Sequence, residues 1–62
     1  MVKVAKANQE GDFHIDIEEI QGWKIKSKTT MGGVVYITIE DGTYSMSRID
    51  HDNIFQKNGQ GN

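Results

Sequence analysis

The chain has 62 residues, with seven Lys and Arg against nine Asp and Glu, and it contains neither cysteine nor proline. A chain this short forms one domain and buries only about 60% of the surface that its unfolded form exposes. Without cysteine, disulfides and thiolate zinc sites are excluded as stabilising devices, so self-association is expected. The formal net charge of -2 gives no overall attraction to nucleic acid or to an anionic membrane. Any basic surface must therefore be local.

Apolar and polar residues alternate from the start of the chain, and this alternation predicts β-strands rather than a disordered polypeptide. The expected strands cover residues 2–7, 12–19, 23–29, 34–40 and 43–49. The turn NQEG at residues 8–11 pairs the first two strands and places Val4 opposite Ile15. The same register places Val2 opposite Ile17.

The next turn is expected at IQG, residues 20–22, where glycine suits the left-handed conformation that a three-residue hairpin loop needs. This turn places Glu18 beside Lys24 and Asp16 beside Lys26 on one face of the sheet. The lysines of the stretch GWKIKSKTT would then have a row of carboxylates as neighbours. Exposed ion pairs of this kind contribute under about 1 kcal/mol each.

Two further turns set the register of the last three strands. A five-residue loop over residues 29–33 places Ile25 opposite Ile37. The dipeptide DG at residues 41–42 accepts the positive φ angles of a tight hairpin and places Ile37 opposite Met46. Both turn assignments place the same residues on the inward face, and this agreement is the strongest evidence for the sheet.

We therefore expect an all-β fold: a five-stranded antiparallel meander that forms a small SH3-like or Sm-like barrel, or an open sheet packed in a homo-oligomer. Its core face is expected to contain Val2, Val4, Phe13, Ile15, Ile17, Trp23, Ile25, Val35, Ile37, Ile39, Tyr44 and Met46. After the last strand, RIDHDNIFQ is expected to form a short helical turn capped by Asp50, with Ile54 and Phe55 covering an open end of the sheet. Residues 1–55 form the expected domain, and residues 56–62 form an expected disordered polar tail.

The DG register places three apolar residues, Val34, Tyr36 and Ile49, together on the face that should contact water. Contiguous exposed apolar area around a tyrosine suggests an interface with a protein partner or with a second copy of the chain. These three residues are the predicted partner-binding site. We expect a small non-enzymatic binding protein that acts as a regulator or inhibitor through protein contact, as small proteins encoded by phages or mobile elements often do.

The alternative function is a nucleic-acid or nucleotide-binding module. Lys24, Lys26 and Lys28 would contact phosphates while Tyr36 stacks on a base, a combination that single-strand-binding sheets use. The stretch DIEEIQGW and the hairpin after it are slightly similar to part of a LytTR-type DNA-binding domain, through a strand pattern that covers about half of the chain. The similarity rests on a generic strand pattern and this chain is shorter than such domains, so we do not assign the chain to that family. The acid-rich stretch 10–19 could instead dock on a basic partner.

Catalytic, metal and cofactor sites are not predicted. Asp50, His51 and Asp52 carry suitable ligand atoms, but three adjacent residues do not converge on one ion without unusual backbone geometry. Ser45, Ser47 and His51 do not suffice for catalysis, because a one-layer sheet of this size leaves little room for a desolvated pocket. The sequence shows neither a signal-peptide pattern nor an apolar run long enough to span a bilayer, so a cytoplasmic protein is expected.

Overall fold

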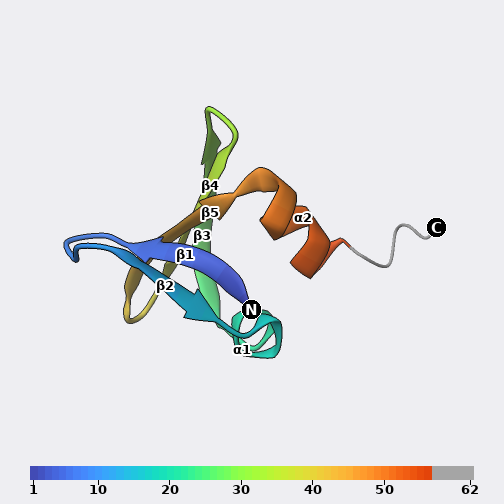
Figure 1. The fold of residues 1–62 in the computed structure, drawn as a ribbon, viewed down its shortest axis with the longest axis horizontal. Coiled ribbons are helices and arrows are strands. Elements are labelled where there is room, and N and C mark those ends of the chain that lie inside the picture. The colour runs from blue at the N-terminus through green and yellow to red at the C-terminus, as the bar shows by residue number, and fades with distance from the viewer. Residues whose placement is uncertain (57–62) are drawn as a thin grey trace.

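The computed structural model describes residues 1–56, which form one five-stranded antiparallel sheet and two short helices (Figure 1). In chain order the elements are β1 (Val2–Lys6), β2 (Asp12–Ile15), α1 (Ile17–Gln21), β3 (Ile25–Met31), β4 (Val34–Ile39), β5 (Gly42–Ser47) and α2 (Arg48–Phe55). The strand order is β2-β1-β5-β4-β3, so β2 and β3 are the edges of an open sheet. The predicted class, a mostly β fold with five antiparallel strands in one sheet, is confirmed in its open form rather than as a closed barrel. The predicted tail, apart from Gln56, lies outside the described residues.

The strand order departs from a simple meander at one place. Strands β3, β4 and β5 follow one another as predicted, and β1 and β2 form the predicted hairpin. The predicted pairing of the second strand with the third is wrong, because β1 pairs instead with β5 through Ala5↔Ser45 and Lys6↔Tyr44. Two hairpin units are therefore joined through the first and the last strand (Figure 1).

The cause of this difference is α1, which replaces the end of the predicted second strand and the IQG turn. Asp16 occupies the N-cap position with extended backbone, and its carbonyl accepts a hydrogen bond from Ile20 N at 3.1 Å. Glu18 and Glu19 lie in the first turn, where carboxylates interact favourably with the helix dipole. Ile20 is completely buried, whereas Ile17, which was predicted in the core, is 36% exposed. The predicted row of carboxylates beside the lysines therefore does not form.

Two of the predicted hairpin registers are each shifted by two residues. In the β1–β2 hairpin, Val4 faces Phe13 rather than Ile15. In the β4–β5 hairpin, the pairs move by the same amount, so that Ile37 faces Tyr44. Side chains repeat their direction every two residues along a strand, so a shift of two leaves each side chain on its predicted face. The predicted core residues of β1, β2, β4 and β5 therefore keep their predicted face despite both shifts.

The loop of the β3–β4 hairpin is shorter than the predicted loop over residues 29–33. Met31 pairs with Val34, so Gly32 and Gly33 alone connect the two strands. Their φ angles of 58° and 79° are left-handed, and glycine adopts such angles without steric strain. Residues that were predicted in a loop therefore belong to β3.

An irregularity in β3 changes the direction of Lys28. The register shifts by one residue between Ile25 and Ser27, so that Lys28 lies opposite the core residue Ile37. A shift of one residue moves a side chain to the other face of a sheet, which is the usual effect of a β-bulge. The predicted row of lysines along one face is therefore interrupted at Lys26.

The core lies between the sheet and the two helices, on one face of the sheet. It comprises Val2, Val4, Ile20, Val35, Ile37, Tyr44, Met46 and Ile54, with Phe13, Ile15, Trp23, Ile25, Ile39 and Phe55 partly buried around them. Gln21 Nε2 donates to Ile54 O at 2.9 Å and so joins α1 to α2. The predicted N-cap Asp50 is wrong: Ser47 is the N-cap, and its Oγ accepts a hydrogen bond from Asp50 N at 3.1 Å. Neither described helix covers the opposite face of the sheet.

Candidate protein-binding surface

The outer face is the face of the sheet opposite the helices. Alternation along the strands assigns to it Lys3, Ala5, Asp12, His14, Ser27, Thr29, Met31, Val34, Tyr36, Thr38, Thr43, Ser45 and Ser47. Its charged groups lie on β1 and β2, where Lys3 Nζ is 3.2 Å from Asp12 Oδ2. The larger part, formed by β3, β4 and β5, carries hydroxyl, aliphatic and aromatic groups. This neutral area can approach another protein without the cost of desolvating a charge.

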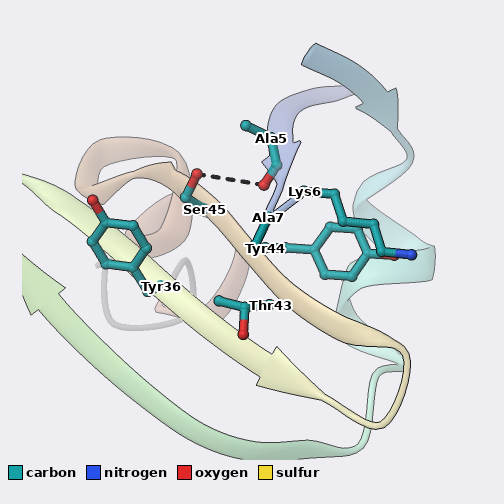
Figure 2. Close-up of a pocket in the computed structure, with 7 residues that line it drawn as sticks. All are labelled: Ala5, Lys6, Ala7, Tyr36, Thr43, Tyr44 and Ser45. Atoms are coloured by element: carbon teal, nitrogen blue, oxygen red, sulfur yellow. Dashed lines mark hydrogen bonds between the residues drawn. The ribbon is translucent and has the colours of Figure 1, made fainter. Parts of the chain in front are cut away.

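A shallow hollow of about 120 Å³ opens beside Tyr36 (Figure 2). It is lined by Ala5, Lys6, Ala7, Tyr36, Thr43, Tyr44 and Ser45. The small side chains of Ala5 and Ala7 leave this space at the β1–β5 junction, where Ala7 N donates to Thr43 O at 2.9 Å. Tyr36 is 37% exposed, and Figure 2 shows its ring pointing away from the ring of Tyr44. The hollow has room for one side chain of a partner.

The structure brings the predicted partner-binding residues together only in part. Val34 and Tyr36 are neighbours on the outer face of β4, as predicted. Ile49 does not lie opposite Val34, because α2 begins at Arg48 and removes Ile49 from the sheet. Ile49 is 74% exposed and lies at the same end of the sheet, since Arg48 N donates to Gly33 O at 2.9 Å.

Sequence reasoning did not include Met31, which it placed in a loop. Met31 is 62% exposed and pairs with Val34, so it extends the apolar area across to β3. The available signal was the GG dipeptide directly after Met31, because two glycines suit a two-residue hairpin loop. We call Met31, Val34, Tyr36 and Ile49 the distal patch.

The predicted nucleic-acid contacts do not share one surface. Lys28 lies on the helix side of the sheet, where its Nζ is 3.0 Å from His51 Nε2. Tyr36 lies on the outer face, so phosphate contacts at Lys28 and base stacking at Tyr36 would occur on opposite faces. Lys24 and Lys26 are exposed at the start of β3, before the regular part of the strand.

His51 connects Lys28 to the acidic side of α2. A lysine ammonium only donates, so His51 Nε2 accepts this hydrogen bond and Nδ1–H donates to Asp52 Oδ1 at 3.2 Å. Lys28 Nζ also lies 4.2 Å from the centre of the Phe55 ring, a cation–π contact. Arg48 Nε is 3.8 Å from Asp52 Oδ2. This network holds α2 against β3, which is a structural role.

A second polar cluster lies at the end of the sheet opposite the distal patch. Asp41 Oδ2 accepts hydrogen bonds from Tyr44 OH at 2.6 Å and from Lys6 Nζ at 3.0 Å. The Tyr44 hydroxyl and the Lys6 ammonium together lower the pKa of Asp41. The hydrogen bond to Asp41 raises the pKa of Tyr44 and also that of Lys6. The cluster ties β1 to the β4–β5 turn, and Trp23 packs on Tyr44 with ring centroids 4.7 Å apart.

An open cleft of about 340 Å³ lies next to this cluster, on the side of β1 and β2. It is lined by Lys6, Gln9, Phe13, His14, Ile15 and Tyr44. Lys6 is already paired with Asp41, so its ammonium is not directed at a ligand in the cleft. The outer face is therefore the stronger candidate for a functional site.

No protein-family model matches this chain, and neither a curated protein nor a solved structure matches it. The helices of the described residues are too short and too polar to cross a membrane. Within residues 1–56, no group of three or more His, Cys, Asp and Glu side chains is placed to hold a metal ion. Function is therefore inferred from the surfaces of the molecule itself.

Proposed function

We propose that this chain is a small, non-enzymatic binding protein that acts through protein–protein contact, with the outer face as a contact surface. The observation that carries the proposal is the position of the distal patch. Met31 and Tyr36 are exposed and Val34 is half-buried on a neutral area of sheet that neither helix covers, and Ile49 is exposed in the first turn of α2. Contiguous exposed apolar area on a small protein favours an interface.

The occupant that we propose for the outer face is a second copy of the chain. Tyr36 lines the hollow (Figure 2). Two copies related by a twofold axis can therefore each place one Tyr36 ring in the hollow of the other. The neutral surface avoids charge repulsion between identical faces. Packing of two sheets face to face also adds buried apolar area that so short a chain lacks in its own core.

Measurement of the mass in solution tests this assembly. At micromolar concentration the wild-type protein should have at least twice the mass of one chain. The variant with Val34→Ser and Tyr36→Ser should be monomeric and keep its circular dichroism spectrum. Asn53→Ser changes an exposed residue of α2 and should leave the assembly intact. A monomeric wild-type protein, or a double variant that still associates, would contradict the proposal.

We further propose that the assembled protein is a cytoplasmic regulator or inhibitor that occupies a protein partner, of the kind that phages and mobile elements encode. The size of the chain supports this part of the proposal. A chain of 62 residues has a large surface relative to its volume. It therefore has ample surface for protein contact but little interior in which to form a desolvated catalytic pocket.

The nucleic-acid alternative has less support, because Lys28 and Tyr36 lie on opposite faces of the sheet. Titration with labelled single-stranded DNA at low and moderate salt separates the two functions. We expect no appreciable binding at physiological salt. Tight binding that weakens steeply with salt and depends on the three lysines would favour the alternative.

A further inference from the structure

The β3 edge, which we define as residues 26–31, is the longer of the two uncovered edges of the sheet. Strand β3 has seven residues, against four in β2. Within the described part of the chain, β3 pairs only with β4. Its other side therefore presents backbone N–H and C=O groups that have no strand partner. Every residue of this edge is exposed.

The β3 edge is basic, although the chain is acidic overall. Lys26 and Lys28 lie on this edge and Lys24 precedes it, while the sequence has no acidic residue between Glu19 and Glu40. Within residues 1–56, Lys24 and Lys26 take part in no ion pair. Their charges are therefore available to a partner.

We propose that the β3 edge binds an extended, acidic segment of the partner protein as an additional strand of the sheet. This inference rests on the proposed function, since it names the chemistry of the partner that the protein occupies. Backbone hydrogen bonds supply affinity in this mode of recognition, and side chains on the edge select the partner. The bulge near Lys26 leaves Ser27–Met31 as the regular part of the edge, so the segment pairs there.

The lysines disfavour two registers in which a second copy of β3 could pair with this edge. An antiparallel pair of β3 strands centred on Ser27 places Lys26 directly opposite Lys28. A pair centred on Lys28 places two Lys28 side chains opposite each other. Like charges in directly opposite positions are destabilising. The lysines therefore disfavour these two registers of self-pairing, and the positive charge of the edge favours an acidic strand.

An acidic peptide also suits this edge better than a nucleic-acid backbone does. A peptide strand donates to the carbonyl groups of the edge and accepts from its amides, whereas phosphate oxygens can only accept. Lys28 Nζ lies 4.2 Å from the centre of the Phe55 ring, which belongs to α2 on the helix side of the sheet. The edge therefore provides strand pairing but no platform for stacking bases.

The probe for this proposal is a short, fluorescein-labelled peptide in which Glu alternates with Val. The comparison peptide has Lys in place of every Glu. In fluorescence anisotropy at low salt, the Glu peptide should bind the wild-type protein at least about tenfold more tightly than the Lys peptide. Hydrogen exchange followed by NMR should show new protection of amides within Ser27–Met31 and unchanged exchange in β2.

Matched charge reversals locate the contact. Lys26→Glu should weaken binding of the Glu peptide about fivefold, whereas Lys3→Glu makes the same change on β1 and should have no effect. The variant with Val34→Ser and Tyr36→Ser should bind the peptide like the wild type even when it is monomeric. The mass in solution therefore tests the outer-face assembly, and peptide binding tests the edge contact independently.

Three results would overturn the edge contact. They are equal affinity for the two peptides, unchanged exchange along Ser27–Met31 when the Glu peptide is saturating, and tighter binding of single-stranded oligothymidine than of the Glu peptide. The last result would assign the β3 edge to nucleic acid instead.

Discussion

The two faces of the sheet share the same strands but differ in what they contribute to folding. On β4, Val35 and Ile37 point to the helices and are 2% and 0% exposed, while Tyr36 between them is 37% exposed. Burial thus changes at every residue along β4, whereas residues 26–31 of the edge strand β3 are exposed on both faces. On the inner strands, the energetic effect of a substitution should therefore depend on the face that the side chain occupies.

The largest effect is expected for Ile37→Ala, on the covered face. Ile37 is completely buried, so its truncation should lower the free energy of unfolding by about 2–5 kcal/mol. A loss of this size is comparable to the whole stability of so small a domain. Chemical denaturation followed by Trp23 fluorescence measures the change. The control Thr29→Ala lies exposed on the outer face and should change the same quantity by less than about 0.5 kcal/mol. Equal losses for both variants would refute a one-sided core.

A smaller effect is expected at the N-terminus of α2, the helix that packs on the sheet. Ser47→Ala removes the hydrogen bond from Asp50 N to Ser47 Oγ and should lower the free energy of unfolding by about 1 kcal/mol. Ser47→Gly should lower it by only a few tenths of that amount, because glycine is tolerated at the N-cap. Thermal and chemical denaturation of the two variants test this order. A larger loss for Ser47→Gly would mean that the cap is not the cause.

The polar cluster at the other end of the sheet should make stability depend on pH at both extremes. The pKa of Asp41 is lowered from 3.8, so its contribution is present above that pH and is lost as pH falls through the folded-state pKa. The pKa values of Tyr44 and Lys6 are raised from 10.0 and 10.5, so their contributions are present below those values and are lost as pH rises further. Melting temperatures across pH should show both declines, and Asp41→Asn should reduce both. An unchanged pH profile in that variant would contradict the role of the cluster.

The smallest effect is expected for Lys24 and Lys26 at the edge, where both residues are exposed and take part in no ion pair within residues 1–56. Lys24→Gln and Lys26→Gln should each change the free energy of unfolding by less than about 0.5 kcal/mol. Lys28→Gln should cost more, about 0.5–1 kcal/mol, because it loses the contact with Phe55. Denaturation of the three single variants tests this order. Equal effects at all three positions would mean that Lys28 is not held on the helix side.

Features that depend on nearby residues could be predicted from the sequence. The DG dipeptide and the alternation around it located β4 and β5, and Val34 and Tyr36 were assigned to the correct face. The error of two residues in register did not matter for burial, because the side-chain direction repeats every two residues. The β1–β2, β3–β4 and β4–β5 hairpins and most of the core were therefore predictable without knowledge of the strand order.

Features that depend on distant residues could not be predicted in the same way. The stretch HIDIE, residues 14–18, alternates like a strand, yet Ile17 and Ile20 have the three-residue spacing of a helix face. Burial of Ile20 in the core with Ile54 of α2 favours the helix, and no local pattern shows that contact. The bulge beside Lys26 is likewise invisible in the sequence, and it moves Lys28 away from the predicted site. Met31 was missed because the GG loop was predicted too long.

The short ladder between β1 and β5 constrains the order in which the chain can fold. The residues that it joins, Ala5↔Ser45 and Lys6↔Tyr44, lie close to opposite ends of the described chain. On a ribosome, the β1–β2 hairpin emerges early but has no edge to join until β5 has been synthesised. The β3–β4–β5 unit contains mostly local pairings and can form by itself, so docking of the N-terminal hairpin is the step with the largest loop-closure cost. Folding speed should therefore respond to the β1–β5 junction more than to any of the three hairpin turns.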